Sequence, residues 1–403
     1  MEFSTHQEDE KEIRGESPLQ MYLDIESQRL VLIVSGWISE KYQDAKPAET
    51  TEAVGRAPDE DGLARSAVPY YYYRHKQYTT TRIFDIADKS QPKLVRQFSQ
   101  TGYYLDSRMV GDSIYVISND YSYRFYPVAA EGEEAPRPED IFPAVSSDHG
   151  DVKLDSFTTV SAGDIAILPD GDVSNQMVIA GIDLINDRIE PDVKAVLGTS
   201  GTIYVSTGFL YVAAYSFNWG FIEPAIRSDN TSAVQEMETE IYRFRLSDGK
   251  ISEAGKGSVP GYIVNQFSMD EYNGYFRVAT TTGNSWEETG ENASRNNLYV
   301  LDSSLRIVGQ VTGLAKGETI KSVRFMGDQA YVVTFRTIDP LFVIDLTKPT
   351  EPVVLGELKI PGYSTYLHPY ADNMLLGFGY DVKEQNGMAF NAGLKVSMFD
   401  ISD

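Results

Sequence analysis

The stretch "TIKSVRFMGDQAYVVTF" (residues 319–335) contains two short runs rich in β-branched and aromatic residues, joined by Gly-Asp. A tight turn between two such runs predicts a β-hairpin. "YYLDSRMVGDSIYVIS" (103–118) repeats this arrangement, and "YSTYLHPYADNMLLGFG" (363–379) repeats it with Asp-Asn at the turn. Three looser copies occupy 18–35, 262–280 and 201–216. In the first two of these, we expect the turn to be about three residues longer.

Each hairpin is followed by a further strand that ends in an acidic turn, as in "IFDIADKSQPKLVRQF" (83–98) and "FVIDLTKPTEPVVLGEL" (342–358). The chain ends on "MFDISD" (398–403), which opens the same phrase again. An Asp side chain at such a place caps the amides of the turn, and proline is tolerated at the start of a strand. We predict these architectural roles for Asp85, Asp345, Asp400, Pro92 and Pro352. The alternative is that the three aspartates bind a metal or a ligand.

A four-stranded unit that recurs at about 45 to 65 residues is typical of a β-propeller, in which neighbouring sheets bury each other's faces. We predict an all-β propeller of about six to eight blades, as a complete or an incomplete ring. The rival, an array of β-sandwiches, would need Greek-key crossovers. The expected domains are a polar tail at 1–17 and a propeller at 18–403, with insertions at 39–68, 127–151 and 218–240.

Composition limits the possible partners. The chain has 59 acidic and 35 basic residues and a net charge of −24, which opposes binding to nucleic acid. It has no cysteine, and its four histidines show no HExxH spacing, so we predict no metal and no other cofactor. The longest apolar run, 30–38, is too short to cross a bilayer, and the polar N-terminus does not resemble a signal peptide.

The phrases at 79–119, 323–370 and 393–403 resemble those of secreted bacterial and archaeal proteins with a C-terminal β-propeller domain distantly related to WD-40 repeats. This resemblance covers nearly all of the chain outside the insertions. It implies a propeller located outside the cell or on its surface, and it brings no catalytic residue with it. Members usually have a signal segment and further strands at both ends, so a truncated chain with an incomplete ring is one expectation, and a ring closed by N-terminal residues is the other.

Alignment of the hairpins predicts a polar funnel. The residue six positions before the second strand is large and polar in three hairpins, and glutamine takes this place in the two copies with longer turns. Side chains two residues away share its face, because side chains alternate along a strand. If this strand is the innermost of each blade, these residues line a partly cationic central channel; the alternative is that they merely solvate its mouth. The predicted funnel residues are Gln20, Asp106, Arg108, Gln266, Arg324, Tyr366 and His368.

The function that we expect is that of a non-enzymatic binding scaffold, a monomer whose partner is another protein or an envelope polymer. The alternative is an extracellular hydrolase or lyase that acts at the central funnel. His368 lies inside the repeat, but no Ser-His-Asp order and no GxSxG motif accompanies it. We therefore predict no catalytic residue and interpret His368 as structural or ligand-binding.

Overall fold

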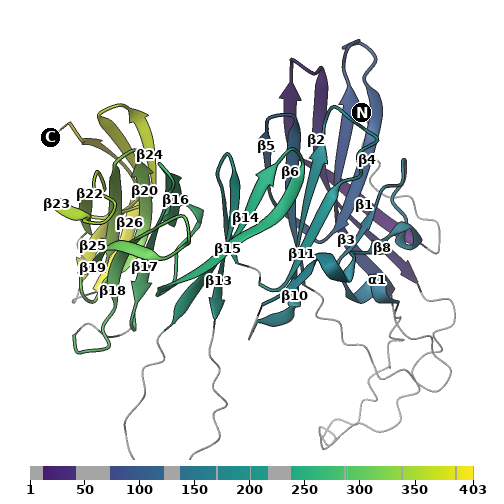
Figure 1. The fold of residues 1–403 in the computed structure, drawn as a ribbon. Helices are drawn as coiled ribbons and strands as arrows, with labels where there is room; N and C mark the ends of the chain where they lie inside the picture. The colour runs from purple at the N-terminus through teal and green to yellow at the C-terminus, as the bar shows by residue number, and fades with distance from the viewer. Residues whose placement is uncertain are drawn as a thin grey trace, which may run out of the picture. The chain divides into compact units, whose positions relative to one another are not determined.

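The computed structural model shows an all-β protein whose strands form six separate sheets in the described part of the chain (Figure 1). The predicted fold class is confirmed, and the six sheets are the blades, numbered 1 to 6 in chain order. The structure describes residues 12–41, 73–121, 137–168, 171–199, 201–216, 237–285, 287, 289–336, 339–385 and 388–402.

The first compact unit comprises Met1–Leu168 and Asp172–Gly198 and holds two blades. Blade 1 has the strand order β1-β2-β3-β4-β7-β8, and blade 2 has the order β5-β6-β10-β11-β9. Their strands are β1 (Glu12–Asp24), β2 (Arg29–Lys41), β3 (Tyr73–Asp85), β4 (Lys93–Thr101), β5 (Tyr103–Val110), β6 (Ser113–Tyr121), β7 (Ala144–Ser146), β8 (Thr158–Thr159), β9 (Ile165–Ile167), β10 (Asp172–Asp183) and β11 (Asp192–Gly198).

The second compact unit comprises Thr199–Asp403 with Pro169–Gly171 and holds blades 3 to 6. Blades 3, 4 and 5 have four strands each in chain order, and the described part of blade 6 has three. The strands are β12 (Thr202–Val205), β13 (Phe209–Ser216), β14 (Glu238–Ser247), β15 (Lys250–Pro260), β16 (Met269–Tyr272), β17 (Tyr275–Thr282), β18 (Arg295–Leu301), β19 (Ile307–Leu314), β20 (Thr319–Met326), β21 (Gln329–Phe335), β22 (Asp339–Asp345), β23 (Val353–Ile360), β24 (Tyr363–Ala371), β25 (Met374–Gln385) and β26 (Met388–Asp400).

The hairpins that open blades 2, 5 and 6 form as predicted, and they share one irregularity. A β-bulge interrupts the pairing of β5, β20 and β24, after Tyr104, Ile320 and Ser364 respectively. A bulge adds one residue to a strand and turns it locally. The three first strands therefore present their later residues in matching directions.

Blades pack face to face, and apolar side chains fill the space between them. In the first unit, Val31 and Ile83 of blade 1 belong to one buried cluster with Ile114 and Ile182 of blade 2. In the second unit, the Tyr211 ring of blade 3 stacks on Phe276 of blade 4, with centroids 4.2 Å apart. Because burial of one such side chain contributes about 1.5–3 kcal/mol, these faces stabilise the stacking of sheets.

The predicted Asp caps are present. A side-chain oxygen of Asp85 accepts a hydrogen bond from the Ala87 amide at 2.9 Å, and Asp345 does the same for Thr347 at 2.9 Å. Asp400 accepts one from the amide of Ser402 at 3.1 Å. The bond from the Ala87 amide lowers the pKa of Asp85, as hydrogen bonds from Ser402 lower the pKa of Asp400. The architectural interpretation of these three aspartates is confirmed.

Glycines with a left-handed backbone join successive blades. Gly102, at φ +97°, lies between β4 and β5, and Gly362, at φ +84°, lies between β23 and β24. A Cβ at Gly102 would lie 2.6 Å from the carbonyl carbon of Asn119 on β6, and one at Gly362 would lie 2.4 Å from the carbonyl oxygen of Tyr380 on β25. Any other residue at these two positions would be strained and would collide with the next blade.

Two expected domain boundaries differ from the structure. β1 begins at Glu12, inside the segment expected to be a polar tail. The described part of the insertion expected at 127–151 contains a short helix, α1 (Pro138–Ile141), and β7, which pairs with β4. Ala144, and Phe157 beyond the stretch, pack against Ile38 and Tyr78 of blade 1, which anchors the described part of this acid-rich stretch. Most of the insertions expected at 39–68 and 218–240 lies outside the described residues.

Candidate binding site on the first strands of the second unit

The first strands of neighbouring blades meet in the second unit. β20 of blade 5 contacts β24 of blade 6 and the 3-10 helix η3 (Gln266–Ser268), which precedes β16 of blade 4. The Ser322 hydroxyl on β20 donates a buried hydrogen bond of 2.7 Å to the Ser364 carbonyl on β24. Contact between first strands is the arrangement expected of strands that surround the axis of a propeller.

Four side chains form a cluster where these three elements meet, which we call the Arg324 cluster: Phe267, Arg324, Tyr366 and His368. The Arg324 guanidinium lies 5.6 Å from the centre of the Phe267 ring, within the range of a cation–π interaction. The rings of Phe267 and Tyr366 are 5.3 Å apart and tilted by 55°. The Tyr366 hydroxyl lies 3.2 Å from Nδ1 of His368. Two predicted funnel residues, Arg324 and Tyr366, thus pack on one aromatic ring, and the third, His368, contacts Tyr366.

The place of Phe267 is set by its own short helix. The Asn265 side chain accepts a hydrogen bond of 2.9 Å from the Phe267 amide, which caps η3 at its start. Phe267 was not among the predicted site residues, because the prediction selected large polar positions of the repeat and Phe267 is apolar. The available signal was local: an Asn two residues before the aromatic residue marks a capped turn.

Arg324 differs from its neighbours in having no anionic partner. Its Nε atom is buried without a hydrogen-bond partner, and no ion pair or hydrogen bond reaches the guanidinium from the described part of the chain. By contrast, Arg277 on β17 bonds through Nε to Asp270 at 3.0 Å, and Arg306 binds Asp302 at 2.8 Å. A partly buried guanidinium without a counter-charge is costly unless a ligand supplies one.

In the first unit, β5 carries Arg108 at the place that Arg324 has on β20. Arg108 lies opposite Tyr115 on β6, as Arg324 lies opposite Tyr331 on β21. Its side chain is exposed, and no ion pair or hydrogen bond is found for it among the described residues. Asp106 shares its face of the strand and accepts a hydrogen bond of 2.8 Å from the Ser107 amide.

The two predicted glutamines do not occupy the place of the arginines. Gln20 directly follows the bulge of β1, as Asp106 follows that of β5, so Tyr22 takes the place of Arg108. Gln266 lies in η3, and on β16 the corresponding place belongs to Asp270.

The expected turn lengths caused this error. β16 and β17 are joined by two residues, as β5 and β6 are, and four residues join β1 to β2. An added length of three residues is therefore wrong for both copies. A single strand was expected from residue 262 onward, whereas η3 occupies Gln266–Ser268 and β16 begins only at Met269.

The Arg324 cluster presents hydrogen-bonding groups beside aromatic rings. A guanidinium presents a planar fork of donors that matches a carboxylate, and Tyr366 and His368 add a hydroxyl and an exposed imidazole. In the described contacts of the cluster, His368 is paired with a phenol rather than with a carboxylate. General-base catalysis needs a base that is oriented by a third group and aimed at a reacting proton.

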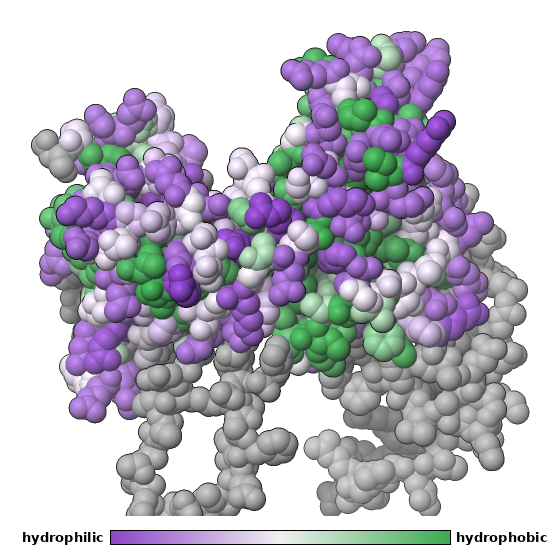
Figure 2. All heavy atoms as spheres, in the orientation of Figure 1, coloured by the Kyte–Doolittle hydropathy of each residue, from purple (hydrophilic) through white to green (hydrophobic). Residues whose placement is uncertain are grey.

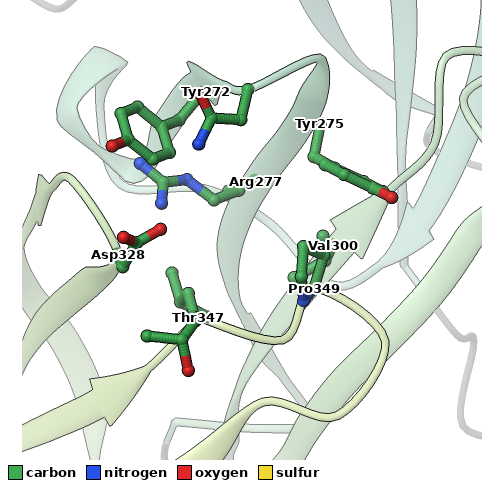
Figure 3. A pocket seen from close by; sticks show the side chains of 9 residues that line it. Tyr272, Tyr275, Arg277, Val300, Asp328, Thr347 and Pro349 are labelled. Atoms are coloured by element: carbon green, nitrogen blue, oxygen red, sulfur yellow. The ribbon is translucent and has the colours of Figure 1, made fainter.

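A small hollow lies elsewhere in the second unit, between the turns of blades 4 and 5 (Figure 3). Tyr272, Arg277, Asp328 and Thr347 line it, and its volume is about 50 Å³. Ligand pockets usually measure about 300–1,000 Å³, so this hollow suits a few water molecules. The Arg277 guanidinium stacks here against Tyr272 of its own blade, with 5.0 Å to the ring centre, and it joins blade 4 to blade 5 by donating a hydrogen bond to the Gly327 carbonyl.

The described residues contain no group of three or more metal-ligating side chains. No described helix is long and apolar enough to cross a membrane. Hydrophilic residues cover most of the surface visible in Figure 2, with apolar patches between them, as the acidic composition leads one to expect.

Comparison with known protein families agrees with this architecture. The family model of the beta propeller domain matches residues 3–403, and the chain therefore belongs to that family. The predicted propeller is thus confirmed by both the family and the sheets of the structure.

Two archaeal proteins, both described as uncharacterised, are similar to parts of the chain. One from Methanocaldococcus jannaschii is 55% identical over 151 residues, which are 38% of this chain and 22% of that protein. One from Archaeoglobus fulgidus is 46% identical over 166 residues, 41% of this chain and 23% of that protein. The matched segments thus span less than a quarter of each relative's length.

Solved structures resemble the chain only distantly. The Pyrococcus horikoshii acylaminoacyl peptidase is 9% identical with a TM-score of 0.32, and the match covers 97% of this chain and 51% of that one. A mutant of the Synechocystis apocarotenoid oxygenase is 10% identical with a TM-score of 0.31, over 82% of this chain and 58% of that one. Likeness at this level carries no argument about function.

Proposed function

We propose that the protein is a non-enzymatic binding scaffold that holds its partner at the first strands of its blades. One observation supports this above all: the Arg324 guanidinium packs on the Phe267 ring, on which Tyr366 also packs, and no described residue supplies a counter-charge. Such a preformed group of donors on rigid strands binds a ligand with little loss of conformational entropy. Arg108 on β5 offers a second, more exposed contact of the same kind.

The proposed location is outside the cell or on its surface, and the proposed partner is another protein or an envelope polymer. The absence of cysteine from all 403 residues is compatible with that compartment, and the resemblance to secreted propellers supports it. We propose that the scaffold acts as a monomer. Protease treatment of intact cells tests the location, since a surface protein is digested while cytoplasmic markers survive; light scattering tests the monomer.

The binding role is tested with immobilised protein and extracts of the cell envelope. We expect the Arg324→Ala/Tyr366→Ala variant to lose most of the specific capture, because both variant sites belong to the cluster. Arg306→Ala is the matched control, since this arginine is 77% exposed and pairs with Asp302 in a turn. Thermal unfolding of each variant verifies that the fold is intact.

Two results would overturn the proposal. If Arg108→Ala combined with Arg324→Ala leaves the capture of every identified partner unchanged, the first strands are not the binding surface. If the protein hydrolyses or eliminates a substrate from a panel of glycosides, esters and peptides, and His368→Ala abolishes that activity, the protein is an enzyme instead of a scaffold.

A further inference from the structure

The Arg324 cluster combines one cation with the aromatic rings of Phe267 and Tyr366 and with two further polar groups, the Tyr366 hydroxyl and the His368 imidazole. The guanidinium packs on Phe267 at 5.6 Å, and Tyr366 packs on the same ring at 5.3 Å. Tyr366 and His368 are hydrogen-bonded to each other at 3.2 Å. In the described residues, no carboxylate takes part in any of these contacts, although the chain has 59 acidic residues.

This set of groups identifies the charged part of a ligand. A guanidinium forms two parallel hydrogen bonds with a carboxylate, and such charge-assisted bonds are the strongest that a neutral-pH site offers. Because Nε of Arg324 is buried and unpaired, we expect the Nη atoms to meet the ligand first. The net charge of −24 makes long polyanions unfavourable, so a single carboxylate per contact suits the cluster best.

The rest of the cluster identifies the body that carries the carboxylate. Tyr366 presents an apolar ring with a hydroxyl at its edge, and such amphipathic side chains contact ligands that have both apolar and polar faces. A pyranose ring has this character, with C–H groups on its faces and hydroxyls around its rim. The hydroxyl of Tyr366 and the imidazole of His368 can both donate to or accept from sugar hydroxyls.

We propose that the Arg324 cluster binds a uronic acid residue of an envelope polysaccharide, with the carboxylate on Arg324 and the sugar ring beside Phe267 and Tyr366. This inference rests on the proposed binding function and names its ligand class. An acidic peptide would also offer carboxylates. It is less suitable, because its charges follow closely along the chain and the cluster supplies a single cation against a strongly acidic protein.

Calorimetric titration of the full chain with glucuronate and with a glucuronate-containing oligosaccharide tests the proposal. Glucose, a matched neutral oligosaccharide and an Asp/Glu-rich peptide serve as the comparison ligands. We expect the uronate ligands to bind and their affinity to fall as salt is added. In Arg324→Ala we expect the affinity to fall by about tenfold to a hundredfold, as for the loss of a charged hydrogen bond. Arg324→Lys should lose part of the affinity, since it keeps the charge without the planar fork.

Two further variants guard against a trivial loss of binding. Tyr366→Phe keeps the ring and removes the hydroxyl, so we expect a loss of about threefold to tenfold without any change in the unfolding temperature. Arg306→Ala removes an exposed arginine that is paired with Asp302, and it should bind like the parent protein. If Arg324→Ala proves unstable, Arg324→Lys and Tyr366→Phe decide the question.

The outcomes separate this proposal from the broader one. Binding of the neutral oligosaccharide as tight as that of the uronate, or full affinity in Arg324→Ala, would show that the guanidinium does not hold a carboxylate. Binding of the acidic peptide in place of the uronate would overturn the proposed polysaccharide ligand, while the proposed function as a binding scaffold would stand. If no uronate binds while envelope capture still depends on Arg324 and Tyr366, the ligand class is wrong and the binding function stands.

Discussion

β5 and β20 carry the same residue at the same register but in different surroundings. Arg108 and Arg324 both follow a bulge and both lie opposite a tyrosine of the second strand. Arg108 is exposed and has Asp106 on its own face, whereas Arg324 is partly buried and rests on the Phe267 ring. The repeat thus determines where the arginine lies, and the neighbouring element determines whether it can form a site. The η3 helix makes that difference.

The largest effect is expected where β5 is anchored to the preceding blade. Gly102→Ala should lower the free energy of unfolding by about 3 kcal/mol, because it combines a left-handed backbone with a clash against Asn119. Gly111, at the other end of β5, has φ +54° and open space around it, so Gly111→Ala should cost about 1 kcal/mol. Chemical denaturation measures both variants. Equal losses would show that the blade-to-blade contact is unimportant.

A smaller effect is expected from the serines on the two strands. Ser322→Ala removes the buried bond from β20 to the Ser364 carbonyl and should lower the free energy of unfolding by about 1–2 kcal/mol. Ser107→Ala on β5 should cost less, because the Tyr22 hydroxyl still reaches the Ser107 carbonyl at 2.8 Å. Denaturation midpoints decide between them, and a larger loss for Ser107→Ala would reverse the comparison.

The smallest expected effect is a pH dependence of the stability that arises beside β20 and not beside β5. Burial raises the pKa of Glu318, the residue before β20, so the folded state holds its proton more tightly than the unfolded chain. This contribution to stability is present below the ordinary value of 4.5 and is lost as the pH rises through the raised pKa. Glu318→Gln keeps an acceptor for Thr334 and should match the parent protein at low pH while exceeding its stability at neutral pH.

Unfolding temperatures at the two pH values measure this difference. Glu351→Gln serves as the control, because Glu351 is 70% exposed and its ion pair with Lys348 is weak. A Glu318→Gln variant that shows no pH-dependent gain over Glu351→Gln would mean that burial of this carboxyl does not affect stability.

Much of the fold could be predicted from the sequence, because its signals are local. The Gly-Asp turn of 319–335 and the cap at Asp345 involve residues that are close together in the chain. The glycines that join the blades lie in the same phrases, but no role was predicted for them. Glycine is required there because of a close contact with the next blade, which the sequence does not show. The helix and strand within 137–151 were not predicted, because an acid-rich stretch gives no sign that blade 1 has an apolar edge to receive it.

The candidate site was predicted in part. Arg324, Tyr366 and His368 were found by counting positions within the repeat, and the structure brings them together. Gln20 and Gln266 were misplaced because a bulge and a turn length cannot be counted from a pattern of residues. Phe267 was missed because it is an apolar residue of η3, a short helix that precedes β16.

The sequence by itself determined the strands, the tight turns, their Asp caps and the repetition of blades, because each depends on interactions within a few residues of the chain. The tertiary structure alone decided which of the repeated polar positions became a cluster. Phe267, Arg324 and Tyr366 come from three elements of three blades, and their contacts depend on how the first strands pack. That packing is set by apolar faces distant in sequence, and no periodic pattern encodes the distance between them.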